Sequence, residues 1–381
     1  DAQESRGLGD VYKRQVMKCA IISVSQAGAK LAEKIAASLQ ADVDLYERKE
    51  YASGAEAKYF TRVMALTTDI FTRYDLIIYI MALGITVRAI APHVQHKTVD
   101  PAILGVDELG TFVISVLSGH LGGANDYARE VAEIIGATPV ITTATDVHGK
   151  VAPDAIARHL QARVEPISAL KTINGAIARG ETVDYFVDER MPLAAEIKNI
   201  LTSFGVAAKP LAELAQTAAV GAVVITDRTD VRPALSHLYL RPPTLVVGMG
   251  CRKDTLQEIL ADALCQACSQ IGRSPLALAG IVSTTVKEHE AGLLALAEQY
   301  RRPIAFYPPE ALLKVAEQYH LEESSFVKNT IGVGNVCETA AILKTKRSQL
   351  LLPKTKFQRT TVAIAEATSL SWESGRDTPQ N

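Results

Sequence analysis

Residues 111–135 read TFVISVLSGHLGGANDYAREVAEII and join an apolar run to a helical pattern through a turn with three glycines. Thr111–Leu117 has the apolar composition of a buried strand, and we expect a helix over Asp126–Ile135. Buried strands that alternate with helices are typical of sheets covered on both faces. The stretch therefore predicts a strand–turn–helix unit of an α/β fold.

The same alternation surrounds this unit and predicts an N-terminal parallel-sheet α/β domain. Lys18–Val24, Val43–Tyr46, Asp75–Met81 and Pro139–Thr143 are the other expected strands, and Ala27–Leu39 and Val63–Phe71 are expected helices.

A second alternating unit follows the consecutive prolines Pro242 and Pro243, which continue neither a strand ladder nor a helix. It predicts a C-terminal α/β domain, with a small α/β middle domain before it. We expect a non-native leader over 1–16, with Met17 as the biological start. The expected domains are 17–145, 146–240 and 241–366, and residues 367–381 form a polar tail.

The composition excludes several classes of protein. A hydrophobic fraction of 48% argues against global disorder, and 40 basic against 42 acidic residues give no overall attraction to nucleic acid. No apolar run reaches the roughly 20 residues of a membrane span. Five scattered cysteines do not make a disulfide framework, so we expect a cytoplasmic protein.

The glycine turn after Leu117 is the densest cluster of residues that could act on a ligand. Its glycines allow a ligand to approach the backbone, the following helix N-terminus attracts anions, and His120 can move a proton near neutral pH. A plain strand-to-helix turn with a surface histidine is the alternative. The candidate residues are Ser118, Gly119, His120, Gly122, Gly123 and Asn125.

A second turn, after the strand Asp75–Met81, opens a short helix in a stretch without acidic residues between Leu76 and Val99. Charges of one sign at strand ends attract an anion, although a solvated helix face is an equal alternative. The candidates are Gly84, Thr86, Arg88, His93 and Lys97.

The C-terminal unit holds two more glycine turns and a late basic run, Thr339–Ala365, without acidic residues. The run is either a solvated face or a site for a partner with many carboxylates. The candidates are Gly248, Gly250, Arg252 and Lys253 in the first turn, Gly332, Gly334 and Asn335 in the second, and Lys354 and Lys356 in the run.

The cysteines predict no zinc site, because Cys265 and Cys268 lack a second ligand pair. We expect these two, with Cys19 and Cys337, to be core residues. Cys251 lies beside Arg252 and Lys253, and a lowered thiol pKa there is a minor alternative.

Several blocks resemble cobalt-precorrin-5A hydrolases, the CbiG-type proteins of anaerobic cobalamin biosynthesis. The C-terminal blocks are also similar to the stand-alone CobE-type protein of the aerobic route. The resemblance covers nearly all of residues 17–366, with one departure at Thr285, where the family pattern leads us to expect Asp. It is carried by Gly84–His93, Asp107–Ser115, Ser118–Asn125, Pro139–Asp146, Val246–Arg252, Lys287, Gly292–Glu298, Ile331–Glu338 and Leu352–Lys354.

The resemblance implies a hydrolase that opens the δ-lactone of cobalt-precorrin-5A with water and releases acetaldehyde, giving cobalt-precorrin-5B. It implies that cobalt arrives within the substrate, so that we expect no cofactor and no metal site. The expected partner is an anionic cobalt-corrinoid. Other pathway enzymes and a second copy in a homodimer are possible partners, and nucleic acid and membrane are not expected.

For this reaction we expect His120 to be the catalytic base, with His93 and Lys97 as second choices. The backbone amides of Gly122–Asn125 are the expected oxyanion donors. We assign the other candidates, with Lys287, to substrate binding, and we expect the glycine turns to converge on one anionic ring system.

Two rival functions remain open. One is a non-catalytic carrier that holds a corrinoid intermediate for neighbouring enzymes, which the CobE-like part favours. The other is a tetrapyrrole methyltransferase, for which no motif of a methyl-donor pocket is present.

Overall fold

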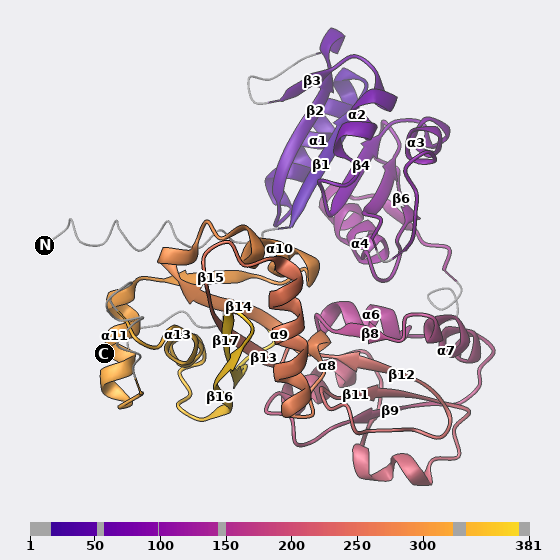
Figure 1. Ribbon diagram of the computed structural model, residues 1–381. Helices are drawn as coiled ribbons and strands as arrows, with labels where there is room; N and C mark the ends of the chain where they lie inside the picture. Colours follow the sequence, from indigo (N-terminus) through magenta and orange to yellow (C-terminus); the bar gives the residue numbers. More distant parts are fainter. Residues whose placement is uncertain (1–16, 52–56, 98, 144–149, 323–332, 373–381) are drawn as a thin grey trace, which may run out of the picture. The chain divides into compact units, whose positions relative to one another are not determined.

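The computed structural model of the chain describes residues 17–51, 57–97, 99–143, 150–322 and 333–372. The chain forms two compact units whose boundary lies between Arg158 and His159. The first unit contains one sheet, and the second contains two (Figure 1). The leader expected over residues 1–16 lies outside the described residues, and the expected domain boundaries stay predictions.

The first unit is built on a seven-stranded sheet in the order β3-β2-β1-β4-β5-β6-β7. Its strands are β1 (Lys18–Ser23), β2 (Asp42–Arg48), β3 (Lys58–Phe60), β4 (Leu76–Ile80), β5 (Ala102–Val106), β6 (Phe112–Leu117) and β7 (Thr138–Val140). Its helices are α1 (Gln26–Ser38), α2 (Val63–Ile70), α3 (Leu83–Ile90) and α4 (Ala124–Ile135), with a 3-10 turn η2 (Lys49–Tyr51), and α6 (Pro153–His159) follows.

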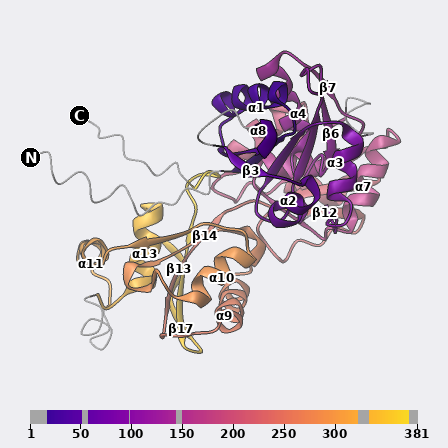
Figure 2. The same cartoon turned by 90° about the horizontal axis from the view of Figure 1, so that it is seen from above.

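Helices cover both faces of this sheet, as the uninterrupted apolar strands predict. One core packs α1 and α4 on the sheet, through residues such as Ile35 and Val131. The other core packs α2 and α3 on the opposite face, through Ile70 and Ile90. Figure 2 shows the strands between the two helix pairs.

The expected parallel sheet contains one antiparallel pair, β5–β6. The connection is a tight turn in which the Asp107 carboxylate accepts the N–H groups of Leu109 and Phe112, and Gly110 has a φ of 68°. A loop this short can join only antiparallel strands, because a parallel crossover needs a dozen or more residues. The chain therefore reverses here, and β6 and β7 run opposite to the other five strands.

The second unit begins with a five-stranded sheet in the order β10-β9-β11-β12-β8, in which only β8 is antiparallel to its neighbour. Its strands are β8 (Arg163–Glu165), β9 (Val183–Val187), β10 (Ala208–Pro210), β11 (Gly221–Ile225) and β12 (Ser236–Arg241). The helices are α7 (Ala169–Ala178) and α8 (Ala194–Ser203), with a 3-10 segment η3 (Leu211–Gln216).

The last sheet has the order β15-β14-β13-β17-β16, with β16 and β17 joined as an antiparallel pair. The strands are β13 (Leu245–Cys251), β14 (Leu278–Thr284), β15 (Ile304–Tyr307), β16 (Leu350–Phe357) and β17 (Thr360–Glu366). The helices are α9 (Gln257–Gln270), α10 (Ala291–Gln299), α11 (Pro309–Gln318) and α13 (Val336–Thr345), with 3-10 turns η4 (Pro275–Ala277) and η5 (Thr285–Lys287).

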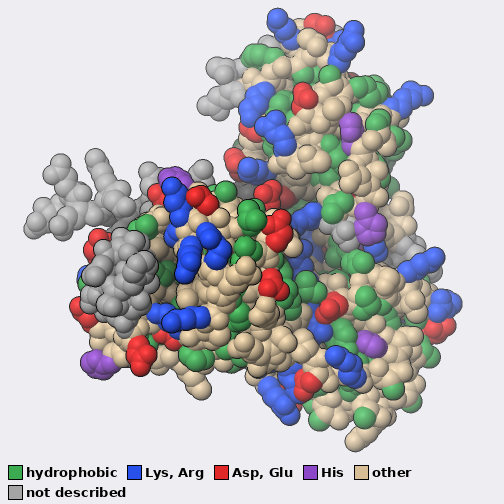
Figure 3. All heavy atoms as spheres, viewed as in Figure 1, with side chains coloured by type: hydrophobic (Ala, Val, Ile, Leu, Met, Phe, Trp, Pro, Cys, Tyr) green, Lys and Arg blue, Asp and Glu red, His purple; other side chains and the backbone are tan. Residues whose placement is uncertain are grey.

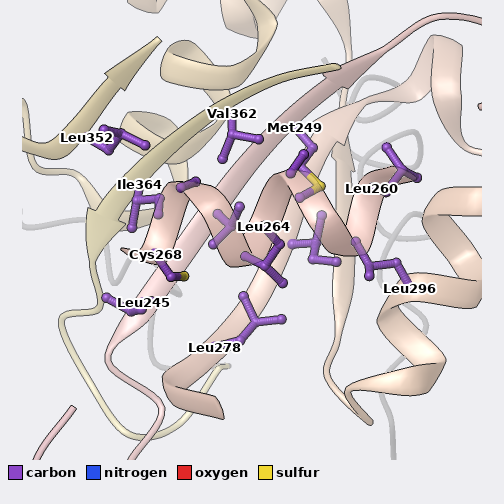
Figure 4. Packing of buried hydrophobic residues seen from close by; sticks show 14 of the residues in the cluster. Leu245, Met249, Leu260, Leu264, Cys268, Leu278, Leu296, Leu352, Val362 and Ile364 are labelled. Carbon is purple, nitrogen blue, oxygen red and sulfur yellow. The ribbon is translucent and has the colours of Figure 1, made fainter. Parts of the chain in front are cut away.

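Helix α9 packs on one face of this sheet, where Leu260 and Leu264 meet Met249, Leu278 and Val362 (Figure 4). Helix α13 packs on the other face through Ala340 and Ala341. It approaches so closely that a Cβ on Gly248 would lie 1.8 Å from the carbonyl oxygen of Cys337. Only glycine fits at this position of β13.

The predicted α/β class is confirmed, and the expected strands and helices appear. The strands that the patterns do not predict are short or lie at sheet edges, with two exceptions. These are β5, whose Pro101 and Gly105 resemble loop signals, and β12, which lies between β11 and β8. The start of the tail is less polar than expected. Ala367 and Leu370 are buried, and the Trp372 ring lies against Gly280.

We predict that Gly248→Ala destabilises the C-terminal sheet by about 1–3 kcal/mol, because the methyl group displaces the first turn of α13. Urea unfolding followed by the fluorescence of Trp372, the single tryptophan, measures this. Gly175→Ala in α7 is the control, since its Cβ would meet only the Arg179 side chain and alanine favours a helix. Equal midpoints for Gly248→Ala and the parent would contradict the prediction.

Candidate active site

The glycine turn between β6 and α4 is anchored to the first unit by two polar side chains. Ser118 donates from Oγ to the carbonyl of Asp100, 3.1 Å away, just before β5. The buried Asn125 accepts a hydrogen bond from Ser115 at 2.7 Å and donates to the Thr143 hydroxyl at 2.9 Å. Asn125, predicted to bind substrate, therefore holds the turn against its neighbours.

Three of the four amides expected to stabilise an oxyanion are engaged within the turn itself. The N–H of Gly123 donates to the His120 carbonyl, that of Ala124 to Ser118 and that of Asn125 to Gly119, at 3.0–3.2 Å. A ligand oxygen would have to replace these bonds. The geometry does not support an oxyanion hole made from these three amides.

His120 lies beside a buried carboxylate that the sequence analysis did not identify. Its Nδ1 is 3.5 Å from Oδ1 of Asp154, in the first turn of α6, and the two side chains are 14% and 4% exposed. A carboxylate beside Nδ1 favours the tautomer that carries its proton there, which leaves Nε2 as the basic nitrogen. The pair can therefore orient a general base.

Arg158, four residues after Asp154 on α6, covers the same turn. Its guanidinium pairs with Asp126 and lies 4.5 Å from the ring centre of Tyr127. A Cβ on Gly123 would be 2.2 Å from Arg158 Nε, and the φ of Gly123 is 84°, so this position needs glycine. Residues four apart share a helix face, but only the tertiary fold brings that face to the turn.

The turn with Gly84 does not converge with the turn that holds His120, so that expectation is wrong within this sheet. Gly84 follows the carboxyl end of β4, whereas Leu117 pairs with Ile103, which pairs with Ile77 near the amino end of β4. The antiparallel β5–β6 connection is the reason, because it sends the end of β6 to the opposite edge.

The chain after α3 does return toward the edge where β6 ends. The Asp100 carboxylate accepts the N–H of Gln95, and the N–H of Asp100 donates to the carbonyl of His96. This turn carries Lys97, which is exposed and forms no ion pair within the described chain. Lys97 is therefore at the edge of the sheet where Ser118 is anchored.

The other candidates around α3 differ in their surroundings. His93 lies against α2, with Nε2 3.2 Å from the Thr68 hydroxyl and its ring 5.6 Å from Phe71. Thr86 is fully buried, and its hydroxyl has no partner among the described residues. Arg88 is exposed on a surface with apolar residues that are 39–50% exposed, namely Leu83, Ile85, Val87, Val94 and Val99.

In the C-terminal sheet, basic side chains follow the carboxyl ends of β13 and β14. Arg252 and Lys253 are exposed, and Lys287 pairs with Glu290 at 2.8 Å. Burial alone would raise the pKa of Glu290, but hydrogen bonds from Lys287 and the Asp254 N–H lower it. This carboxylate therefore stabilises the fold at neutral pH, and that stability is lost as the pH falls through its lowered pKa.

The two glycine turns of the C-terminal sheet do meet, but through packing. Gly334 and Asn335 are buried, and the Asn335 side chain caps α13 by accepting the N–H of Glu338 at 3.3 Å. Lys354 donates to the carbonyl of Gly334 at 3.2 Å. Lys356 is exposed and Gly250 is half-buried, so both are accessible to solvent. Gly332 lies outside the described residues.

The cysteine predictions are partly wrong. Cys19, Cys268 and Cys337 are buried as expected, but Cys265 is exposed, because it faces away from the core that Cys268 joins. Burial raises the pKa of Cys251 to about 11, and Lys287 lowers it by a smaller amount. The alternative of a lowered thiol pKa at Cys251 is therefore wrong.

The described residues contain no cluster of three His, Cys, Asp or Glu side chains that could hold a metal ion. Within the same residues, no helix combines the length and apolar character that a membrane crossing needs.

Three family models match the chain in order. They describe the N-terminal region of cobalamin synthesis protein G at residues 65–146, the cobalamin biosynthesis central region at 151–242 and the cobalamin synthesis G C-terminus at 245–365. Together with the three sheets, these matches define an α/β protein of cobalamin biosynthesis. His120 and Asp154 lie in the first and second matched regions.

The chain is 37% identical over 303 residues to a cobalt-precorrin-5A hydrolase of Salmonella typhimurium, covering 78% of this chain and 83% of that protein. It is 30% identical over 366 residues to that of Priestia megaterium, covering 91% and 94%. The chain belongs to the cobalt-precorrin-5A hydrolase family. The solved structure of CobE, from the cobalamin biosynthetic pathway, aligns with 33% of this chain and 93% of its own at 30% identity, with a TM-score of 0.30.

We predict that iodoacetamide at pH 8 alkylates Cys265 first and Cys251 at least about tenfold more slowly, because the thiolate is the nucleophile and little forms at a pKa of about 11. Peptide mapping by mass spectrometry over a time course measures both rates. Comparable rates at the two cysteines would show that the burial of Cys251 does not suppress its reactivity.

Proposed function

We propose that this protein catalyses the cobalt-precorrin-5A hydrolase reaction of cobalamin biosynthesis, with His120 as the general base and Asp154 as its positioning residue. The observation that carries the mechanism is the contact between His120 and the buried Asp154 beside a glycine turn. Identity to named hydrolases over most of the chain supports the reaction.

The first step is hydrolysis of the δ-lactone. Nε2 of His120 accepts a proton from water while the water oxygen bonds to the lactone carbonyl carbon. The ring C–O bond then breaks, and the departing oxygen takes a proton. Asp154 stabilises the imidazolium that forms between these events.

The second step is fragmentation. A base removes the proton of the freed hydroxyl group, the adjacent carbon–carbon bond breaks, and acetaldehyde leaves while the electron pair stays with the macrocycle. The same histidine can serve both steps, because each needs one proton acceptor at the same part of the substrate. Cobalt is carried by the substrate in this proposal.

Local charges support binding of a polyanionic ring. The formal net charge is −2, and basic and acidic side chains are interspersed on the face in Figure 3. Attraction must therefore come from particular cations, and Arg88 and Lys97 beside exposed apolar side chains suit a ring with a carboxylate rim. Arg252 and Lys253 are further candidates. The cytoplasmic location, other pathway partners and homodimer stay predictions.

We predict that His120→Ala lowers turnover by about a hundredfold or more while corrinoid binding persists. Acetaldehyde release from the lactone substrate measures turnover. His289→Ala is the matched control, because that histidine is 94% exposed in the C-terminal sheet domain. Near-normal release by His120→Ala would dismiss its assignment as base, and wild-type protein that binds corrinoid without releasing acetaldehyde would favour the carrier.

We predict that Asp154→Asn lowers turnover and moves the acid limb of the pH–rate profile to lower pH, because a neutral amide no longer stabilises the protonated imidazole. A purely structural role would lower the rate without moving that limb. The profile of kcat/KM between pH 5 and 8, with thermal unfolding as a check on folding, separates these outcomes.

A further inference from the structure

One face of the middle sheet is covered without an α-helix. Strands β9 and β10 are joined through α8, whereas η3 joins β10 to β11 and an irregular loop, residues 226–235, joins β11 to β12. Parallel crossovers are right-handed, and the β10–β11 and β11–β12 connections run along the sheet in the direction opposite to the β9–β10 connection. They therefore lie on the face opposite α8. Within the described part of the middle domain, that face is covered by a 3-10 segment with no buried residue and by a loop.

A cavity of about 750 Å³ lies between the 3-10 segment η3 and the loop 226–235 on this face. Its volume is within the range of small-molecule sites, and it borders the residues that follow β9 and β11, where ligands of α/β sheets commonly bind. Its apolar side is formed by partly buried side chains that pack on Phe186 and Tyr239, namely Leu211, Leu214, Val231 and Leu235.

The acidic groups of the wall are paired with basic side chains. The buried Asp188 accepts hydrogen bonds from the Thr226 hydroxyl at 2.9 Å and the Arg190 N–H at 3.2 Å. Glu189 pairs with Lys198, and Arg228 lies 3.7 Å from the Asp188 carboxylate and also pairs with Asp230. Asp188 and Glu189 therefore each have a cation beside them.

Two arginines of the wall keep their charge available. Arg190 and Arg232 are exposed, and neither forms an ion pair in the part of the chain that the structure describes. Arg232 donates only to backbone carbonyls, those of Thr229 and Val231. The cavity therefore combines an apolar side with a net positive wall, which suits a ligand with an apolar body and a carboxylate.

We propose that this middle-domain cavity binds an amphipathic carboxylate, with the apolar body on Leu211 and Leu214 and the carboxylate at Arg190 and Arg232. We identify the ligand as a corrinoid macrocycle, which binds through its acidic rim, and this identification rests on the proposed function.

Hydrogen–deuterium exchange on the full chain tests the proposal. We expect cobyrinic acid, a corrinoid edged with carboxylates, to slow exchange in peptides covering 211–217 and 226–235. Cobinamide, which has amides in place of those carboxylates, should not. Arg190→Glu should raise the cobyrinic acid concentration for half-maximal protection by at least about tenfold, because a charged hydrogen bond is replaced by repulsion.

Lys171→Glu is the matched control, because it makes the same charge change at an exposed position on α7. This variant should leave the concentration for half-maximal protection unaltered. Equal protection by cobinamide, no protection by any probe, or equal effects of the two variants would overturn the proposal. Protection by octanoate but not by cobyrinic acid would contradict the identification of the ligand as a corrinoid macrocycle. His120→Ala keeps the protection, so failure of the hydrolase mechanism appears in acetaldehyde release and failure of the cavity appears in exchange.

Discussion

The reversal of the chain between β5 and β6 is the constraint on which the N-terminal site depends. If β6 ran parallel to β5, the turn after it would lie at the same edge as the turn after β4. The Asp107 turn is too short for a parallel crossover, so the end of β6 and His120 are placed at the opposite edge. There, α6 supplies both the Asp154 carboxylate beside His120 and, one turn later, the Arg158 guanidinium over Gly123.

Sequence patterns predict the fold class and the glycine turn, because uninterrupted apolar strands and glycine clusters are local signals. They do not predict Asp154 as the partner of His120. The two residues are 34 positions apart, and nothing in either local stretch encodes their contact. The direction of β6 has a local cause in DELG (107–110), yet its effect on the position of the turn appears only when the strand order is known.

Glycine-rich turns in this chain serve two different physical purposes. Gly248 allows α13 to pack against β13, and Asn335 caps that helix, so their turns are needed for packing of the C-terminal sheet. Gly123 instead accommodates Arg158 beside a histidine that stays partly exposed. A sequence signature of glycines between a strand and a helix is the same in both cases, and only the side chains that approach the turn distinguish them.

The middle sheet follows from the same reasoning about connections. A helix of three turns between β11 and β12 would complete the cover of the sheet, as α7 and α8 do on the other face. The ten residues 226–235 form a loop instead, held by Tyr239, which donates to the Val231 carbonyl at 2.7 Å. The missing helix leaves leucines and valine partly exposed beside arginines without ion pairs in the described chain, and a region with no motif in its sequence thereby acquires the chemistry of a binding site.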